Sequence, residues 1–214
     1  MTIVFAVRPC LAAPCDGPRE IREARPLAVR AFVLSTGKDV LTLAGYSGAE
    51  YEDGRSMLGT VEQALVERDP GRWIVSIGAT AAGIGAAYEL AKQYGFETIG
   101  VVSSLARDEK VELSKCVDVV FLVPDATWGG ATMDGRLSPT SLAVVETGTE
   151  FLAIGGGEAT RDEMLAARRQ GKAVSFVPAD MNHDIARQRA ASKGLAAPAD
   201  FRGPADAALR GKAD

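Results

Sequence analysis

Three consecutive glycines, Gly155 to Gly157, end an apolar run and precede Thr160 and Glu163 in the stretch FLAIGGGEATRDEM. Two interpretations fit these residues. Thr160 and Glu163 form T-x-x-E, a capping box in which hydroxyl and carboxylate bind free amides of a helix's first turn. Alternatively, the glycines surround a phosphate or ribose, and Glu163 faces sugar hydroxyls or a breaking glycosidic bond.

A second glycine-rich segment, SIGATAAGIGAAYELA, also joins a strand-like run to a helix-like one. Its backbone around Gly78, Thr80 and Gly83 could face an anion at the positive end of a helix. The spacing is not the G-x-G-x-x-G dinucleotide fingerprint, and no lysine follows as in a P-loop. The alternative is a tight turn built from small residues. A third junction, AGYSGAEY, adds Gly45 and Ser47 as candidate binding residues.

The loop VPDATWGGATMDGRLSPTS, residues 123–141, follows another strand-like run. Loops of this length in compact domains are often binding loops or lids. Trp128 is a candidate to stack on a base, and Asp125 to accept hydrogen bonds from hydroxyls or a base amine. The alternative is a surface loop with Trp128 packed onto the core.

The only histidine, His183, lies in PADMNHDIA after a further strand-like run, where it, Asp180 and Asn182 either border the site or are structural. A lone histidine does not supply the four ligands of a structural zinc site, even with three cysteines. We therefore expect no metal and no bound cofactor. The cysteines are predicted to be buried or surface thiols in a reducing compartment: Cys10, Cys15 and Cys116.

The elements that must position these residues follow an α/β pattern, in which apolar runs of strand length alternate with helical periods. It predicts a Rossmann-like doubly wound parallel sheet with helices on both faces, in a single domain. The predicted strands are 40–44, 73–77, 98–102, 117–123, 150–154 and 173–177. The predicted helices are 54–67, 84–94, 107–115, 139–146 and 161–170.

The two ends of the chain are harder to interpret. Residues 1–38 are treated as an N-terminal extension in which LAVRAFVL is either a strand or an outer helix. Residues 39–195 form the predicted nucleotide-binding domain, and 196–214 a loose tail. In doubly wound sheets ligands bind beyond the carboxyl ends of the strands, so all three glycine-rich junctions should share one edge.

Composition narrows the function further. The chain has 214 residues, 47% apolar, with 23 glycines and a net charge of −4. Its basic residues are scattered and form no stripe that would neutralise a row of phosphates, so we expect no nucleic-acid partner. No stretch approaches 18 apolar residues, so we expect no membrane span and a cytoplasmic protein.

Two motifs together resemble the lysine-decarboxylase-like or LOG family of nucleoside-monophosphate phosphoribohydrolases, within the wider SLOG superfamily. GATAAGIGAAYELAKQYGFETIGVV, residues 78–102, is similar to that family's first glycine-rich stretch, and GGGEATRDE, residues 155–163, to its P-G-G-x-G-T-x-x-E. The resemblance covers about residues 40–177. It implies a homodimer that binds a nucleotide or ribosyl phosphate, with Glu163 as the catalytic carboxylate and a phosphate cradle made by Gly156, Gly157, Ala159 and Thr160.

The sequence also departs from this family. Gly155 replaces the motif's proline and Ala159 its fourth glycine, and Thr140 and Ser141 stand where phosphoribohydrolases carry an Arg-Lys pair. Two functions therefore stay open. The first is a hydrolase that cleaves the N-glycosidic bond of a nucleotide. The second is a nucleotide or cofactor sensor or carrier without turnover, as in parts of the SLOG superfamily and the similar molybdenum-cofactor carriers.

Overall fold

The alternating apolar and helical segments assemble into one sheet of seven parallel strands, in the order β1-β5-β4-β3-β2-β6-β7. The computed structural model describes residues 15–210. The strands are β1 Glu20–Glu23, β2 Asp39–Gly45, β3 Trp73–Ile77, β4 Glu97–Ser103, β5 Val119–Val123, β6 Glu150–Ile154 and β7 Ala173–Val177. The helices are α1 Pro26–Thr36, α2 Gly54–Val66, the 3-10 turn η1 Gly83–Ala86, α3 Ala87–Gln93, α4 Leu105–Asp108, α5 Pro139–Thr147, α6 Glu158–Arg169, α7 His183–Ser192 and α8 Pro204–Leu209.

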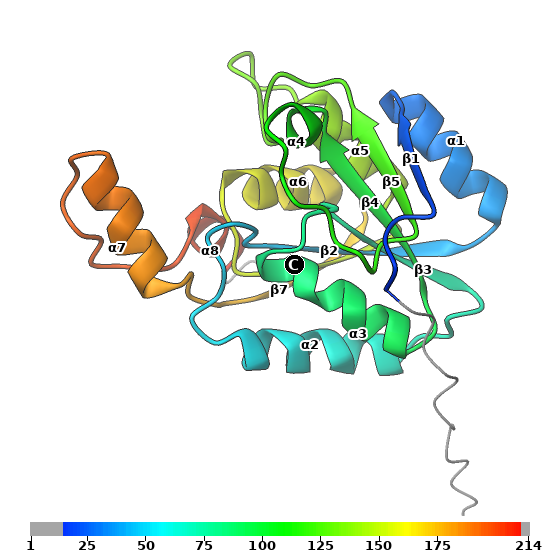
Figure 1. Cartoon of the computed structure of the whole chain (residues 1–214), viewed down its shortest axis with the longest axis horizontal. Helices are drawn as coiled ribbons and strands as arrows, with labels where there is room; N and C mark the ends of the chain where they lie inside the picture. Colours follow the sequence, from blue (N-terminus) through cyan, green and yellow to red (C-terminus); the bar gives the residue numbers. More distant parts are fainter. Residues whose placement is uncertain (1–14, 211–214) are drawn as a thin grey trace, which may run out of the picture.

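Helices cover both faces of the sheet, with α2 and α3 on one side and α5 and α6 on the other (Figure 1). Each face has its own apolar core. Leu41 and Leu43 of β2 pack towards α2 and α3, whereas Val40 and Ala44 of the same strand pack towards α5 and α6. This alternation explains why the strands are nearly continuous apolar runs. The predicted Rossmann-like doubly wound α/β fold is confirmed.

The N-terminal part of the described chain belongs to this sheet. β1 pairs in parallel with β5, and α1 packs on α5. Of the two alternatives for LAVRAFVL, the helix is correct, because Pro26 begins it and Gly37, with a φ of 66°, ends it in the left-handed conformation. The C-terminal tail is not loose throughout, because Ala205 and Leu209 of α8 are buried against α6.

The predicted helix over residues 107–115 is wrong. α4 ends at Asp108, and Lys110 has a positive φ of 55° that interrupts a helix. The chain then runs extended, and Leu113 forms a β-bridge with Thr80. Although its apolar residues recur at a helical period, this segment pairs with the glycine-rich turn after β3 and forms no helix. Among residues 15–210, no helix is both long enough and apolar enough to cross a membrane.

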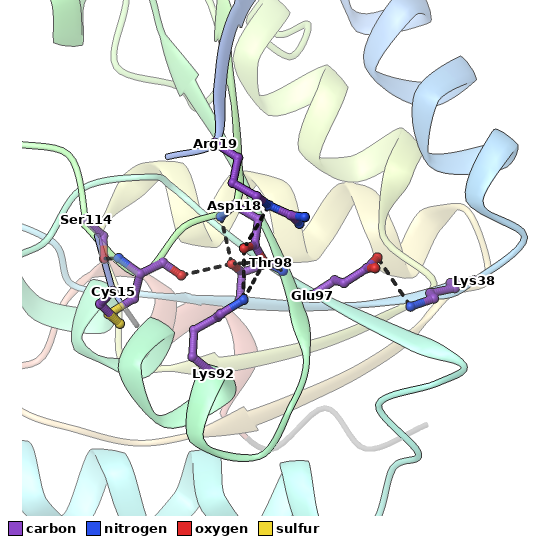
Figure 2. Close-up of polar contacts among 9 residues, drawn as sticks. Cys15, Arg19, Lys38, Lys92, Glu97, Thr98, Ser114 and Asp118 are labelled. Carbon is purple, nitrogen blue, oxygen red and sulfur yellow. Dashed lines mark hydrogen bonds and ion pairs between the residues drawn. A yellow bond between two sulfur atoms is a disulfide. The ribbon is translucent and has the colours of Figure 1, made fainter. Parts of the chain in front are cut away.

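A charged network joins the amino ends of β4 and β5 (Figure 2). Lys92 Nζ donates to both carboxylate oxygens of Asp118, at 2.8 and 2.9 Å, and Arg19 Nε lies 3.3 Å away. The amide and hydroxyl of Thr98 donate to the same carboxylate, at 2.9 and 3.0 Å. Burial alone would raise the pKa of Asp118, but these hydrogen bonds from Lys92 and Thr98 hold it below its usual range. The network therefore stabilises an ionised carboxylate inside the fold.

Cys15 and Cys116 form a disulfide beside this network (Figure 2). The prediction of free thiols is wrong for these two residues, while Cys10 lies outside the described residues. The bond links positions 101 residues apart, which sequence spacing does not reveal. It attaches the segment before β1 to the start of β5, where Arg19 also reaches Asp118.

Candidate functional site

One cavity of about 900 Å³ opens beyond the carboxyl ends of β2, β3 and β4, and α5, α6 and α7 complete its walls. The order of strands reverses between β2 and β6 at this edge, which is where doubly wound folds bind ligands. Eight of the twelve predicted site residues line it: Gly45, Ser47, Gly78, Thr80, Trp128, Ala159, Thr160 and Glu163. The cavity thus brings together residues from all three glycine-rich junctions and the long loop.

Glu163 lies in the cavity wall with its carboxylate hydrogen-bonded to Ser141. The Ser141 hydroxyl donates to Glu163 Oε1 at 2.6 Å. Burial raises the pKa of Glu163 from its ordinary value of 4.5 to about 7, although Ser141 partly counteracts the effect. At neutral pH the carboxyl is therefore divided between its charged and neutral forms.

Of the two interpretations of T-x-x-E, the capping box does not fit the structure. α6 begins at Glu158 with Gly157 in the N-cap position, so Thr160 and Glu163 lie inside the helix. The Thr160 hydroxyl donates to the carbonyl of Gly45 at 3.3 Å, and thus connects α6 to β2. Both side chains make tertiary contacts at the cavity, and neither binds the free amides of the first turn.

The long loop after β5 is fastened to the two helices that flank Glu163. Gly130 N donates to Ser141 Oγ at 2.7 Å, and Ala131 N donates to the carboxylate of Asp162 at 2.8 Å. A Cβ on Gly129 would lie 3.0 Å from Ser141 Oγ, and its φ is 103°, so glycine suits this close approach. The next residue back, Trp128, is 45% exposed and lines the cavity, so it is not packed onto the core.

Asp125 shapes this loop and does not line the cavity. Its Oδ1 accepts from the amide and hydroxyl of Thr127, both at 2.8 Å, and its Oδ2 accepts from Thr140 N at 2.9 Å. Burial alone would raise the pKa of Asp125, but the hydrogen bonds from Thr140 and Thr127 lower it. The carboxylate thereby positions the start of α5, and its predicted contact with a ligand has no support in this geometry.

Three predicted glycines also lie outside the cavity lining. Gly83 has a φ of 61° and packs so closely on the loop after β2 that a Cβ would lie 2.2 Å from Tyr46 O. Gly156 accepts a hydrogen bond from Ala205 N of α8, and Gly157 is the N-cap of α6. Close packing accounts for Gly83 and Gly156, whereas a Cβ on Gly157 would have no atom within 4 Å. The predicted roles of these glycines in binding an anion stay predictions.

The segment after β7 forms a separate cluster. Asn182 caps α7 through Ile185 N, and the His183 ring stacks on Phe201 with centroids 3.9 Å apart. Asp180 pairs with Arg202 and lines a smaller cavity of about 290 Å³. These residues do not line the large cavity, so the structural interpretation of His183 fits the geometry.

The residues predicted from the sequence do not include six polar residues of the cavity: Thr42, Ser76, Ser103, Glu112, Thr140 and Arg189. Thr42 and Ser76 interrupt otherwise apolar strands, which is a visible signal. Arg189 comes from α7 and donates from Nη2 to the carbonyl of Gly48 at 2.7 Å, an arrangement that has no signal in the sequence. Within residues 15–210 no group of three or more His, Cys, Asp or Glu side chains could hold a metal ion.

No protein-family model matches the chain, and neither does any curated protein. Solved structures are similar in fold. The molybdenum cofactor carrier protein MCP from Chlamydomonas reinhardtii is 20% identical, with a TM-score of 0.47 over 77% of this chain and 91% of that one. The molybdenum cofactor binding protein from the phototrophic bacterium Rippkaea orientalis is 19% identical, with a TM-score of 0.49 over 73% and 85%. DNA processing protein A from Streptococcus pneumoniae is 15% identical, with a TM-score of 0.45 over 75% and 58%. At these values the likeness concerns the fold alone.

Proposed function

We propose that this chain is a carrier or sensor that binds a nucleotide-like phosphorylated small molecule in the large cavity and releases it unchanged. The observation that carries the proposal is the state of Glu163. Its carboxylate accepts from Ser141 at 2.6 Å, and burial raises its pKa to about 7. Thr140 and Ser141 are neutral residues where the resemblance to phosphoribohydrolases requires an Arg-Lys pair.

A Glu163 carboxyl that is partly neutral is poorly suited to stabilise an oxocarbenium-like ribose. Cleavage of an N-glycosidic bond develops positive charge on the sugar, which an ionised carboxylate beside it stabilises. A group with a pKa of about 7 is ionised in only about half of the molecules at pH 7. The neutral form instead donates a hydrogen bond, with which it holds a ligand.

The cavity contains complementary groups for the two ends of a nucleotide-like molecule. Trp128 offers an aromatic face at one side. The hydroxyls of Ser47 and Thr80 lie 2.8 Å apart next to Gly48, whose carbonyl accepts from Arg189, and Arg189 is the only Lys or Arg side chain that residues 15–210 contribute to the lining. An anionic group suits this second region, since a guanidinium with one bond to Gly48 O retains other donors.

A second candidate function is the phosphoribohydrolase, because the raised pKa of Glu163 also suits a general acid. A general acid that protonates a leaving group near pH 7 needs a carboxyl with such a value. Glu163 would then protonate the departing base. In the resemblance to the LOG family this residue occupies the motif's carboxylate position.

Mass spectrometry separates these two functions. Ligand extracted from the purified chain with denaturant is expected to be intact. The purified chain should release no free base from a panel of nucleoside monophosphates. Binding of molybdenum cofactor is measured in a separate titration. Free base that appears with wild type and disappears with Glu163→Gln would establish the hydrolase and refute the carrier.

The remaining expectations on partners are proposals of the same kind. We expect a homodimer in the cytoplasm that does not bind nucleic acid. Light scattering at micromolar concentration measures the mass directly, and a monomeric mass would remove the dimer from the proposal.

A further inference from the structure

The sheet has two edges, β1 and β7, and they differ in how well they resist further pairing. β1 is only four residues long and carries Glu20, Arg22 and Glu23, of which Glu23 pairs with Arg107. Short and charged edge strands resist pairing with another chain. β7 has the sequence AVSFV, without a charge or a proline, and its β-branched and aromatic residues favour strand pairing. The β7 edge is therefore the one that is open to a further strand.

The backbone groups on the outer side of β7 belong to Val174 and Phe176. Gly155 N donates to Val177 O at 2.8 Å, so the carbonyl of Val177 faces β6. Because successive residues of a strand alternate in direction, Val174 and Phe176 direct both their N–H and their C=O groups away from β6. Among residues 15–210 no backbone group pairs with these two residues on that side.

The open edge is limited to β7 itself. At its carboxyl end, Pro178 has no N–H to donate, and Met181 N already donates to Phe201 O. At its amino end, Lys172 N already donates to Ala167 O. A partner strand can therefore form hydrogen bonds with β7 and not with the residues on either side of it.

The face of β7 on the α2 side has room for a neighbour. Ala173 and Ser175 are exposed there, and two cavities of about 290 and 230 Å³, which share Thr60 of α2, lie along β6 and β7. On the opposite face Val174 and Phe176 are half-buried, and α6 is the helix that packs on the strand. A strand beside β7 would continue both faces of the sheet.

We propose that β7 pairs antiparallel with β7 of a second copy of this chain, with Ser175 opposite the partner's Ser175 at the two-fold axis. In this register Val174 lies opposite the partner's Phe176 on each side of the axis, and the two residues exchange both of their N–H···O bonds. Pro178 lies opposite the partner's Lys172, where neither residue has a free N–H. The ladder thus ends without leaving a donor unpaired. The inference rests on the homodimer expected under the proposed function and names its surface.

The two neighbouring registers are less complete. If Phe176 lay on the axis, Val174 would lie opposite the partner's Pro178, which has no N–H. If Val174 lay on the axis, Phe176 would lie opposite the partner's Lys172, whose N–H is already used by Ala167 O. The register centred on Ser175 is the one that pairs every outward group of Val174 and Phe176.

The charges at the two ends of β7 also suit an antiparallel pair. At the amino end lie Arg168 and Arg169, in the last turn of α6, while the acidic Glu67 and Glu150 at this end already face Arg68. The cavity at the carboxyl end is lined by one arginine, Arg202, and three acidic residues, Glu52, Asp53 and Asp180. Antiparallel pairing places the basic end of each copy beside the acidic end of the other, which favours this orientation.

Charged substitutions at the two-fold axis test the proposal. Ser175 is exposed and lies outside the large cavity, so Ser175→Lys and Ser175→Glu should both fold, which circular dichroism checks. Residues directly opposite have Cβ atoms about 5 Å apart, so each variant brings like charges together and should weaken the dimer at least about tenfold. Mixed in equal amounts, the two variants should regain a dimer as tight as that of wild type, because opposite charges then meet. Sedimentation equilibrium measures the masses and dissociation constants.

Ile21→Lys is the matched control, because Ile21 is an exposed residue of the other edge strand, and it should keep the wild-type dimer. Amide hydrogen exchange followed by NMR tests the register. The amides of Val174 and Phe176 should be protected in wild type and exchange rapidly in Ser175→Lys. The amides of Ala173 and Val177, which face β6, should stay protected in both proteins.

A wild-type dimer that both Ser175 variants leave intact would overturn the inference and assign the expected homodimer to another surface. A mixture of the two variants that stays monomeric would overturn it as well. A monomeric wild type at micromolar concentration would refute the inference together with the expected homodimer, and would leave the β7 edge to a different protein. Ligand extraction from the same variants tests the carrier separately, because β7 does not line the large cavity and bound ligand should be retained.

Discussion

Asp118 and Glu163 are two carboxyl groups in the interior of the same fold, and the protein treats them in opposite ways. Asp118 lies at the amino ends of the strands and receives hydrogen bonds from Lys92 and Thr98, which lower its pKa. Glu163 lies at the carboxyl ends, has one partner, Ser141, and its pKa rises to about 7. Several hydrogen bonds stabilise the ionised carboxylate at the first edge, whereas the carboxyl group at the second edge accepts one hydrogen bond, from Ser141.

The difference assigns stability to the edge of the sheet with Asp118 and ligand binding to the edge with Glu163. In the Asp118 network both carboxylate oxygens accept hydrogen bonds from Lys92 Nζ, and one of them also accepts from the amide and hydroxyl of Thr98. Glu163 lines the cavity, and Ser141 is its one hydrogen-bond partner among the described residues. Polar groups that are incompletely satisfied in a native structure are candidates for function. Substitutions at the first edge should therefore change folding, and those at the second should change binding.

The largest effect is expected for Asp118→Asn. The substitution removes the charge that Lys92 and Arg19 face, and it leaves a buried ammonium without its counter-charge. Breaking a buried pair in this way costs about 3 kcal/mol or more. Urea unfolding followed by circular dichroism measures the loss.

Asp134→Asn is the control for this prediction. Asp134 also pairs with an arginine, Arg136, but the pair is exposed and should contribute little. Equal unfolding midpoints for the Asp118 and Asp134 variants would show that the buried network does not stabilise the fold. Ligand affinity should be unchanged in both.

The pH dependence of stability should show the two carboxyl groups acting with opposite signs. Asp118 has a lowered folded-state pKa, so its contribution is present above its unfolded value and disappears as the pH falls below about 4. Glu163 has a raised pKa, so the unfolded chain ionises first and stability falls as the pH rises from 4.5 to about 7. The second effect is at most about 3 kcal/mol, because part of the side chain contacts cavity solvent.

Glu163→Gln isolates that second effect. Glutamine can still accept from Ser141 but does not ionise, so the variant should match wild type at pH 4.5 and exceed its stability by about 2 kcal/mol at pH 8. Unfolding midpoints measured between pH 4.5 and pH 8 give both curves. Parallel curves for the two proteins would mean that Glu163 titrates as an exposed glutamate does.

Much of the fold follows from local pattern. Strands β3, β6 and β7 begin and end where their apolar runs predict, because flanking polar and glycine residues delimit them. The false helix over residues 107–115 had a helical period as well, but the bridge between Leu113 and Thr80 decided its conformation. β1 was missed since its four residues, EIRE, have almost no apolar signal and depend on pairing with β5.

Residues of the site could be predicted from the sequence only where glycine-rich or polar residues directly follow a strand. The three glycine-rich junctions meet at one cavity because parallel strands share an edge. The role of Glu163 was not readable from T-x-x-E, since the sequence does not show that α6 begins at Glu158 and moves both residues inside the helix. Arg189 and the Cys15–Cys116 bond depend on contacts across more than 100 residues, which no local pattern encodes.

An intermediate effect is expected for Trp128→Ala on ligand binding. An aromatic face against a base contributes about 1–3 kcal/mol, so the affinity for the nucleoside monophosphate that wild type binds most tightly should fall about tenfold, with unfolding unchanged. Met133→Ala on the same loop is the control, because that side chain is fully exposed and does not line the cavity. Calorimetry on both variants makes the comparison. Equal affinities would show that Trp128 does not touch the ring.

The smallest effect concerns Thr160, and it distinguishes a helix cap from a tertiary contact. Thr160→Ala removes the hydrogen bond to Gly45 O, which should cost about 1 kcal/mol, an amount that loss of an N-cap would also give. Thr160→Asn separates the two causes. Asparagine is among the best N-cap residues, but Thr160 lies inside α6, where asparagine has a lower helix propensity than alanine, and the longer side chain does not place a donor where the Thr160 hydroxyl meets Gly45 O. The asparagine variant should therefore unfold at lower urea than the alanine variant, and recovery of wild-type stability with asparagine would restore the capping interpretation.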